Sequence, residues 1–229
     1  AFIAIAPNAS GEGETLADYW PDMQVDLSLR HRQPHTQLER RQADLIARVD
    51  QWCGEYEENI RARGGIGFFL GGIGPDGHIG FNMRGSDHFS TTRLCETNYE
   101  TQAASASDLG GIEVAAKRLV ITVGLGTITY NPACAAIIMA AGDAKAPMVR
   151  DAVEHAPDVL YPATALHKLP AACFYITRGA AKLLEQRQLA QLAAAEAPSA
   201  QDIEKAVIDL SLQNGRTIAQ LQPTDLAGN

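Results

Sequence analysis

The sequence lacks the features that mark several large classes of protein. It has no apolar run of about 18 residues, so we expect no transmembrane helix. Basic residues are in the minority, and the formal net charge of −8 argues against nucleic acid or an anionic membrane as the main partner. No internal repeat is present. These absences leave room for a local basic pocket that binds a phosphorylated metabolite.

Cysteine is scarce, and histidine forms no cluster. No C-x-x-C pair occurs, so we expect free, buried thiols and a reducing, cytoplasmic setting, in preference to a disulfide or metal set, for Cys53, Cys95, Cys134 and Cys173. His31 and His35 are spaced i and i+4, but Pro34 prevents a regular helical pair. We therefore expect no metal site, and we expect no cofactor.

The first residues, AFIAIAPNAS, have no basic segment and are too short for a signal peptide. The chain also begins without Met. We expect from this that it is a fragment or a processed form of a longer protein.

One long helix is predicted from its period. In residues 36–62 the apolar side chains recur every three or four positions, with Thr36 as the N-cap and Gly64 and Gly65 as the stop. The run at 66–72 is nearly all apolar, which is typical of a strand buried on both faces of a parallel sheet.

Strands and helices alternate along most of the chain. Further strands are expected at residues 1–7, 118–128, 132–142 and the start of 171–186, and helices at 145–155 and after Gly179. This order predicts an α/β fold with a mainly parallel sheet flanked by helices. We expect one α/β domain over residues 1–186 and a helical tail or connector over residues 187–229, broken at Pro198.

Three of the expected strands end in glycine-rich sequence, at residues 71–78, 124–127 and 141–145. In open α/β sheets, ligands bind beyond the carboxyl ends of the strands. Freed backbone amides there suit an anionic group, and Lys145 opens a helix nearby. The three segments therefore predict one pocket.

The first of these segments carries an acid and a histidine. Gly74 and Gly77 permit positive φ and Pro75 stiffens the turn, so the loop presents Asp76 and His78 two residues apart. A carboxylate orients an imidazole and tunes it for acid/base work. The alternative is a capping aspartate beside a structural histidine. A dinucleotide fingerprint is excluded, because no helix start follows the glycines.

The stretch FFLGGIGPDGHIGFN, residues 68–82, resembles the signature of glucosamine-6-phosphate deaminases, which share a superfamily with 6-phosphogluconolactonases. The resemblance spans residues 50–186 and continues, in order, through STTRL, RLVITVGLGTI, IIMAAGDAKA and AVEH. IGFN after GPDGH favours the deaminase branch. The resemblance implies a Rossmann-like three-layer sandwich and an aldose–ketose isomerisation that releases ammonia and gives fructose 6-phosphate.

The resemblance also implies roles for single residues. His78 would assist the opening of the sugar ring, and Asp76 would hold His78 in its working state. Gly72 and Gly74 would bring backbone amides to the substrate.

Two basic residues match family positions that meet phosphate. Lys145 aligns with the lysine that contacts the sugar phosphate. Arg93 aligns with an arginine that binds an effector phosphate at a subunit interface in allosteric members, with a solvated arginine as its alternative. The implied partner is a phosphorylated amino sugar, and a homo-oligomer is left open.

The sequence departs from the family pattern at the site itself. Met83 stands where the family has a glutamate that completes the ring-opening group, and Met cannot relay a proton. Asp87 or His88 is close enough in sequence to compensate.

Other family features are missing or altered. No phosphate-gripping GGTP-type loop and no acidic DEY-type segment is found, and Asp18 is a weak candidate for the base in that segment. The family position of an arginine that contacts the phosphate aligns near Ser107, in a poorly matching region, 96–111, that we interpret as a candidate lid. We expect either the C-terminal portion of a longer deaminase or a diverged member.

Three hypotheses follow. The first is a deaminase-like enzyme, and whether its activity survives these changes is left open. The second is a lactonase-like hydrolase in which His78 activates water. The third is a non-catalytic sugar-phosphate sensor that keeps the pocket without the base.

Overall fold

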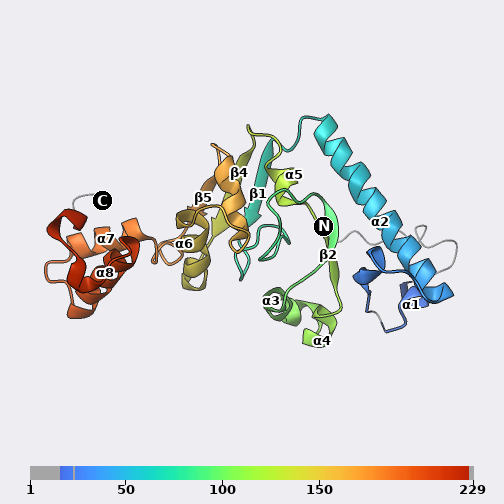
Figure 1. The fold of residues 1–229 in the computed structure, drawn as a ribbon, viewed down its shortest axis with the longest axis horizontal. Helices are drawn as coiled ribbons and strands as arrows, with labels where there is room; N and C mark the ends of the chain where they lie inside the picture. Colours follow the sequence, from blue (N-terminus) through green and yellow to red (C-terminus); the bar gives the residue numbers. More distant parts are fainter. Residues whose placement is uncertain (1–15, 23, 227–229) are drawn as a thin grey trace.

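The structure, a computed structural model, describes residues 16–22 and 24–226 (Figure 1). The strand expected at residues 1–7 lies outside the described residues. The described chain runs from α1 and the long helix α2 at one end, through a central sheet, to α7 and α8 at the other end (Figure 1).

The central sheet is parallel, as predicted. It contains β1 (Phe68–Gly72), β4 (Ala135–Ala140) and β5 (Cys173–Ile176) in the order β1-β4-β5. Phe68 pairs with Ala135 and Ile137 pairs with Cys173. Parallel neighbours need a long crossover. Here the crossover from β1 to β4 contains the motif loop, β2, α3, α4, β3 and α5.

The strand expected at 118–128 differs from the prediction. Only Leu119–Thr122 (β3) is extended, and it pairs antiparallel with β2 (Arg93–Glu96) in a separate two-stranded sheet. The chain then turns into the short helix α5 (Leu125–Ile128). Between β2 and β3 lie α3 (Tyr99–Leu109) and α4 (Ile112–Ala115). The partner strand was missed because RLCE is short and half polar.

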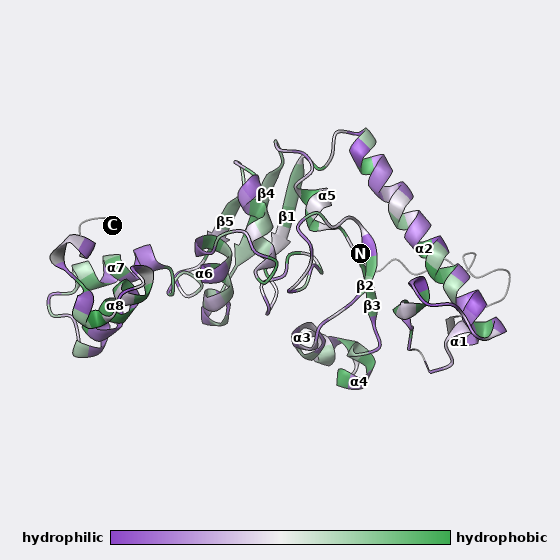
Figure 2. Cartoon of the chain, viewed as in Figure 1, coloured by the Kyte–Doolittle hydropathy of each residue, from purple (hydrophilic) through white to green (hydrophobic). Residues whose placement is uncertain are grey.

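Helix α2 (Gln37–Ala62) confirms the prediction at both ends. Thr36 and Glu39 form a reciprocal capping box, and Gly64 and Gly65 follow with φ of 86° and 87°. α1 (Leu16–Tyr19) and a 3₁₀ turn at Leu27–Arg30 pack against α2 around a small core cluster. Polar residues are spread along most of α2, whereas β1, β4 and β5 are mainly apolar (Figure 2).

The main core lies on one face of the parallel sheet. Beneath that face pack α6 (Ala146–Glu154) and a 3₁₀ segment, Pro162–Lys168. The largest fully buried apolar side chains of this core are Ile79, Leu125, Ile128, Ile138, Val149 and Leu166. The described residues thus form a mixed α/β fold with helices flanking a parallel sheet, as the sequence predicts.

The opposite face of the same sheet is exposed, so the expectation that β1 is buried on both faces is wrong for the described chain. Phe68, Leu70, Met139 and Tyr175 point to this face with 60%, 53%, 54% and 63% of their surface exposed. Alternation along each strand puts every second side chain on this side. We call this set the bare sheet face.

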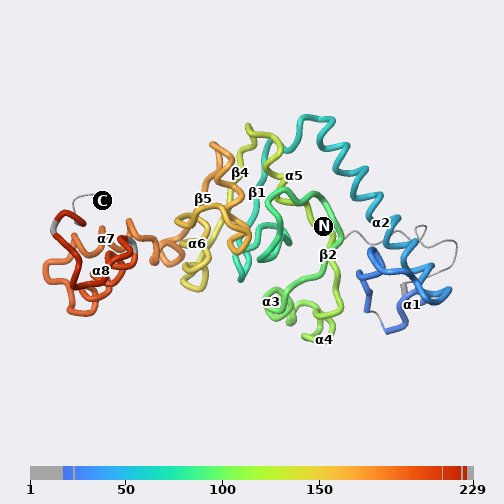
Figure 3. Tube along the Cα trace, viewed as in Figure 1, coloured from blue at the N-terminus to red at the C-terminus, as the bar shows by residue number. Residues whose placement is uncertain are grey.

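The C-terminal part is helical, as expected, but starts later. The chain passes from β5 through turns to α7 (Glu185–Ala194) and α8 (Ala200–Gln213), so the helix expected after Gly179 begins at Glu185 (Figure 3). Pro198 lies between α7 and α8, and Ser199 caps α8. Two 3₁₀ turns, Ile218–Gln220 and Pro223–Leu226, follow. The division at residue 186 stays a prediction.

Candidate functional site

The site begins where β1 ends. Two backbone hydrogen bonds close the loop after it: Gly74 N donates to the carbonyl of His78 at 2.9 Å, and Gly77 N donates to the carbonyl of Gly74 at 3.1 Å. Gly77 has φ of 84°, a value that glycine adopts without strain. The loop thus holds a fixed shape that the glycines permit, and it fixes Asp76 and His78 relative to each other.

Asp76 and His78 form a buried pair. Nδ1 of His78 lies 2.5 Å from Oδ1 of Asp76, and the side chains are 10% and 1% exposed, respectively. A carboxylate only accepts, so the imidazole donates through Nδ1–H. Among the described residues Nε2 has no hydrogen-bond partner, which leaves this atom to act on a ligand.

Gly74 provides the space for the pair. A Cβ at Gly74 would lie 2.1 to 2.3 Å from the ring atoms of His78, far inside van der Waals contact. Its φ is not positive, unlike that of Gly77, so the expected conformational role is found only at Gly77. The amide of Gly74 already donates to His78, whereas Gly72 is exposed at the end of β1.

Asp76 is held as a carboxylate. Burial alone would raise its pKa, but hydrogen bonds from His78, from the backbone N of Arg84 at 3.1 Å and from Nδ2 of Asn98 at 2.6 Å lower the pKa well below the usual range. Both oxygens are therefore occupied: Oδ1 by His78, and Oδ2 by Arg84 and Asn98. The carboxylate can orient the imidazole at neutral pH without itself taking a proton.

The imidazole of His78 is also packed from two sides. The ring of Phe81 lies stacked against it with centroids 5.9 Å apart. Oγ1 of Thr101, in the first turn of α3, lies 3.4 Å from Nδ1 of His78 and donates to Sδ of Met83 at 3.3 Å. The region expected to be a lid thus supplies part of the wall as a helix.

Met83 is buried beside the pair, and neither proposed substitute for a glutamate reaches it. Nε2 of His88 lies 3.1 Å from the carbonyl of Asp158. The carboxylate of Asp87 accepts from Phe89 N at 2.8 Å and is exposed. Neither side chain hydrogen-bonds to Asp76 or His78 among the described residues, and compensation for Met83 by Asp87 or His88 stays a prediction.

Two of the three glycine-rich segments converge. Nζ of Lys145 donates to the carbonyl of Ile73 at 2.7 Å, which joins residues 141–145 to the motif loop. The third segment packs against Ser90, since a Cβ at Gly124 would lie 2.0 Å from the carbonyl oxygen of Ser90. This close backbone approach accounts for the glycine there without a ligand.

The guanidinium of Arg93 is anchored inside the protein. It donates to Oδ1 of Asn82 at 2.8 Å, to Oγ of Ser86 at 3.2 Å and to the carbonyl of Thr91 at 3.3 Å. The simple alternative of a solvated arginine is therefore wrong. Asn82 is fully buried and also donates to the carbonyls of Ile79 and Val123, so it fixes the end of the motif.

Three residues that support the motif loop or the pair were not predicted from the sequence: Asn82, Asn98 and Thr101. Asn98 is the N-cap of α3, and its Oδ1 accepts from Thr101 N at 3.1 Å. An asparagine before a helical stretch is an ordinary N-cap signal, and it was hidden because 96–111 was interpreted as a lid. Ser107 lies on α3 and is exposed.

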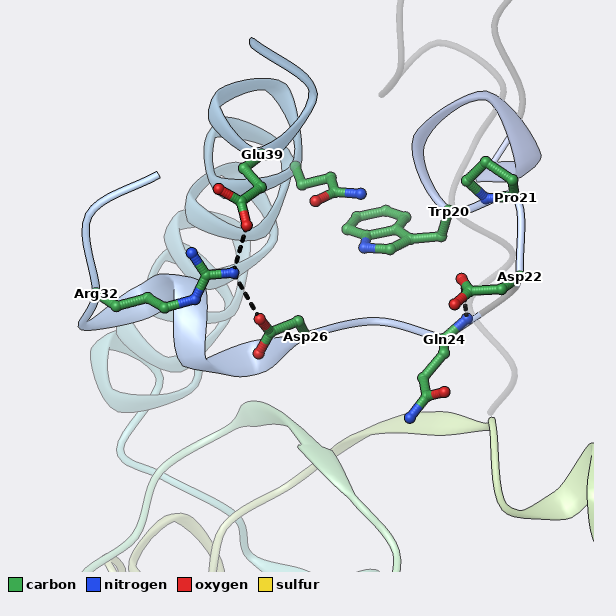
Figure 4. A pocket seen from close by; sticks show the side chains of 8 residues that line it. Trp20, Pro21, Asp22, Gln24, Asp26, Arg32 and Glu39 are labelled. Carbon is green, nitrogen blue, oxygen red and sulfur yellow. Dashed lines mark hydrogen bonds and ion pairs between the residues drawn. The ribbon is translucent and has the colours of Figure 1, made fainter. Parts of the chain in front are cut away.

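A hollow of about 450 Å³ lies away from the pair, between the start of α2 and the segment that follows α1. Figure 4 shows Trp20 facing Asp26 and Glu39, with Arg32 ion-paired to both carboxylates at 2.8 and 2.7 Å. Among its described lining residues Arg32 is the cation, and both ion pairs already neutralise it. Asp18 belongs to α1 beside α2, well apart from β1 (Figure 1).

No group of three or more His, Cys, Asp or Glu side chains among the described residues is placed to hold a metal ion. None of the described helices combines the length and the apolar character needed to cross a membrane. All four cysteines are free, Cys53 and Cys134 buried and Cys95 half-buried, whereas Cys173 is exposed, contrary to expectation.

Comparison with known proteins agrees with the motifs. No protein-family model matches the chain. Glucosamine-6-phosphate deaminase of Porphyromonas gingivalis is 40% identical over 114 residues, 50% of this chain and 43% of that protein. The Bacillus velezensis enzyme is 38% identical over 134 residues, covering 58% and 54%, and glucosamine-6-phosphate deaminase 1 of Mesocricetus auratus is 36% identical over 137 residues, covering 60% and 45%.

A solved structure gives the same result for the fold. The structure of a monomeric glucosamine-6-phosphate deaminase, described as a missing link of the NagB superfamily, matches with a TM-score of 0.52 and 32% identity. The match covers 57% of this chain and 53% of that one. The chain spans about half the length of the curated relatives that it matches. Over that part, the resemblance to glucosamine-6-phosphate deaminases is confirmed.

Proposed function

We propose that this chain binds a phosphorylated amino sugar and contributes acid/base groups to a deaminase-type reaction. In that reaction glucosamine 6-phosphate and water give fructose 6-phosphate and ammonia. The observation that carries the proposal is the buried contact between Asp76 and His78 at the carboxyl end of β1. The similarity to glucosamine-6-phosphate deaminases supports the choice of substrate.

His78 is proposed to act on the sugar ring. With Nδ1–H held by Asp76, Nε2 carries the lone pair and can exchange a proton with the ring oxygen or the adjacent hydroxyl as the ring opens. Asp76 keeps its negative charge beside the imidazole, so it stabilises the protonated ring that forms when Nε2 takes a proton. Neither step needs a cofactor.

Lys145 is proposed to meet the phosphate. Its ammonium lies at the loop after β1, held by one carbonyl, and an ammonium has three donors. The donors not used by Ile73 can face an anion. The exposed end of β1 at Gly72 would supply a backbone amide, whereas Gly74 acts by leaving space for His78. Arg93 is a candidate contact for an effector phosphate, although its guanidinium already binds Asn82 and Ser86.

A cytoplasmic setting is part of the proposal, and the four free thiols support it. Self-association is a separate question, since the solved relative is described as monomeric.

A sensor without turnover is the second candidate, and Met83 is the observation that favours it. Its sulfur lies where the family pattern has a glutamate, and it accepts a hydrogen bond from Thr101 without offering a proton. On this hypothesis the pocket binds the sugar phosphate and performs no deamination.

The test is an ammonia-release assay with glucosamine 6-phosphate, run beside a thermal-shift titration with the same compound. Deaminase activity predicts ammonia from the wild-type chain and its loss in His78→Asn. The control His31→Asn changes an exposed histidine outside the site and should retain activity. Stabilisation without ammonia would support the sensor, and hydrolysis of 6-phosphogluconolactone would support the lactonase. Neither binding nor turnover would end the proposal.

A further inference from the structure

Asn98 makes two hydrogen bonds with different atoms of one side chain. Its Oδ1 accepts from the backbone N of Thr101 at 3.1 Å, which caps α3. Its Nδ2 donates to Oδ2 of Asp76 at 2.6 Å. The orientation of the amide is fixed by chemistry, because a backbone N–H only donates and a carboxylate only accepts.

The bond to Asp76 crosses 22 residues of sequence and joins two different elements. Oδ1 of Asp76 already faces His78, and within the described part of the chain Oδ2 accepts from Arg84 N and from Asn98. Asn98 thus supplies one of the two donors that stop the carboxylate from rotating away from the imidazole. A neutral donor does this without adding a charge to the site.

The same turn of α3 touches the imidazole directly. Thr101, whose backbone is held by Asn98, places Oγ1 at 3.4 Å from Nδ1 of His78. The cap therefore fixes the carboxylate with one atom and the neighbouring hydroxyl with another. A helix cap needs only an acceptor oxygen, which serine, threonine or aspartate also supplies. The Nδ2 donor of Asn98 is therefore not required for capping α3.

We propose that Asn98 is a positioning residue for the Asp76–His78 pair, and that its amide couples the start of α3 to the geometry of the pair. The proposal deepens the proposed function and rests on it for its kinetic consequence. Its structural consequence, the state of the Asp76 carboxylate, can be measured with or without turnover.

The two roles of Asn98 separate by substitution. Asn98→Ser keeps an oxygen for the cap but loses the amide that reaches Asp76. Asn98→Asp keeps the cap and places a second carboxylate beside the first. Asn98→Ala loses both roles. Ser199→Ala is the matched control, because Ser199 caps α8, far from the pair in the sequence and in Figure 1.

The first readout is steady-state ammonia release. Asn98→Ser keeps the cap and should therefore lower the melting temperature less than Asn98→Ala does, while kcat falls about tenfold, the loss expected when a hydrogen bond to a charged group is removed, with little change in KM. In Asn98→Asp kcat should fall further than in Asn98→Ser. Ser199→Ala should melt earlier with kcat unchanged. A normal kcat in Asn98→Ser would leave Asn98 as a cap only and overturn the proposal.

The second readout needs no activity. The carboxyl carbon resonance of Asp76, followed by NMR over pH in the wild-type chain and in Asn98→Ser, should show a higher pKa of Asp76 in the variant because a donor is lost. An unchanged titration would overturn the proposal. If the wild-type chain releases no ammonia, the proposed function fails, and this titration still decides whether Asn98 positions Asp76.

Discussion

Nζ of Lys145 donates to the carbonyl oxygen of Ile73 at 2.7 Å and so ties the chain after β4 to the loop after β1. The ammonium is half-buried and has no carboxylate partner among the described residues. A cation held this way, at the carboxyl end of a parallel sheet, is well placed to meet an anionic group.

Replacing Lys145 should therefore weaken sugar-phosphate binding. For Lys145→Met we expect a rise of tenfold to about a hundredfold in the dissociation constant for glucosamine 6-phosphate, measured by calorimetry, since a charge-assisted hydrogen bond contributes about 1.5–3 kcal/mol. Lys182→Met is the control, because that exposed lysine pairs with Asp143 at 2.8 Å. Equal affinity in the two variants would remove Lys145 from the site.

A side chain at position 74 should displace the imidazole. In Gly74→Ala the new Cβ would overlap the ring of His78, so the contact with Asp76 breaks or the loop shifts. We expect a loss of about 1–3 kcal/mol in the free energy of unfolding and moved His78 resonances in NMR spectra. In Gly72→Ala the nearest atom to the Cβ, the carbonyl oxygen of Met139, lies at 3.7 Å, so this control should be tolerated. Equal losses in both variants would contradict the steric reason.

The sequence predicted those parts of the fold that local patterns determine. The 3.6-residue period and the caps determine α2, and the apolar run before glycines determines β1. The parallel pairing of β1, β4 and β5 followed from alternation of strands and helices. Asp76 and His78 were found because they are neighbours within one loop.

Contacts between distant segments were not predictable in the same way. Asn98 lies 22 residues from Asp76, and Glu57 lies 70 residues from Thr127, yet each pair is hydrogen-bonded. The strand expected at 118–128 failed for the same reason, because its partner β2 is short and polar and the pairing depends on the tertiary fold. Exposure of one face of β1 depends on what surrounds the sheet, which no local pattern encodes.

Glu57 should make stability depend on pH. This buried carboxylate accepts from Thr127 Oγ1 at 2.7 Å, from Arg61 Nε at 2.9 Å and from the N and Oγ1 of Thr92. Burial raises its pKa, but these hydrogen bonds outweigh burial and lower the pKa below the usual value. The unfolded chain then takes up the proton first as the pH falls. The contribution of Glu57 is therefore present above about pH 4.3 and is lost as the pH falls below it.

Urea unfolding at pH 7 and near pH 4 tests this. In Glu57→Gln the free energy of unfolding should fall by about 1–3 kcal/mol at pH 7, because the ionised acceptor is gone. It should also depend less on pH than in wild type. Glu58→Gln, at the exposed neighbouring position, should differ little from wild type at either pH. If Glu57→Gln lost more stability than wild type between pH 7 and pH 4, the predicted direction of the pH effect would be wrong.

The bare sheet face should tolerate truncation, unlike the opposite face. Leu70 is 53% exposed, so Leu70→Ala should change the free energy of unfolding by less than about 0.5 kcal/mol. Ile138 is fully buried on the adjacent strand, so Ile138→Ala should lower the free energy of unfolding by about 2–5 kcal/mol. Chemical denaturation of the isolated chain would measure both changes. A loss above 2 kcal/mol for Leu70→Ala would mean that this face is covered in solution.

The hydrogen bond from Lys145 to Ile73 also bears on the order in which the parts of the site form. It closes a separation of 72 residues, and within the described chain β1 pairs in its sheet with β4 alone. Closing so long a loop costs entropy before any contact rewards it. During synthesis the GPDGH segment therefore emerges well before the chain that anchors it. The partners of the acid/base pair, Phe81 to Thr101, precede Lys145 in the chain, so the cation is the last of these groups to be synthesised.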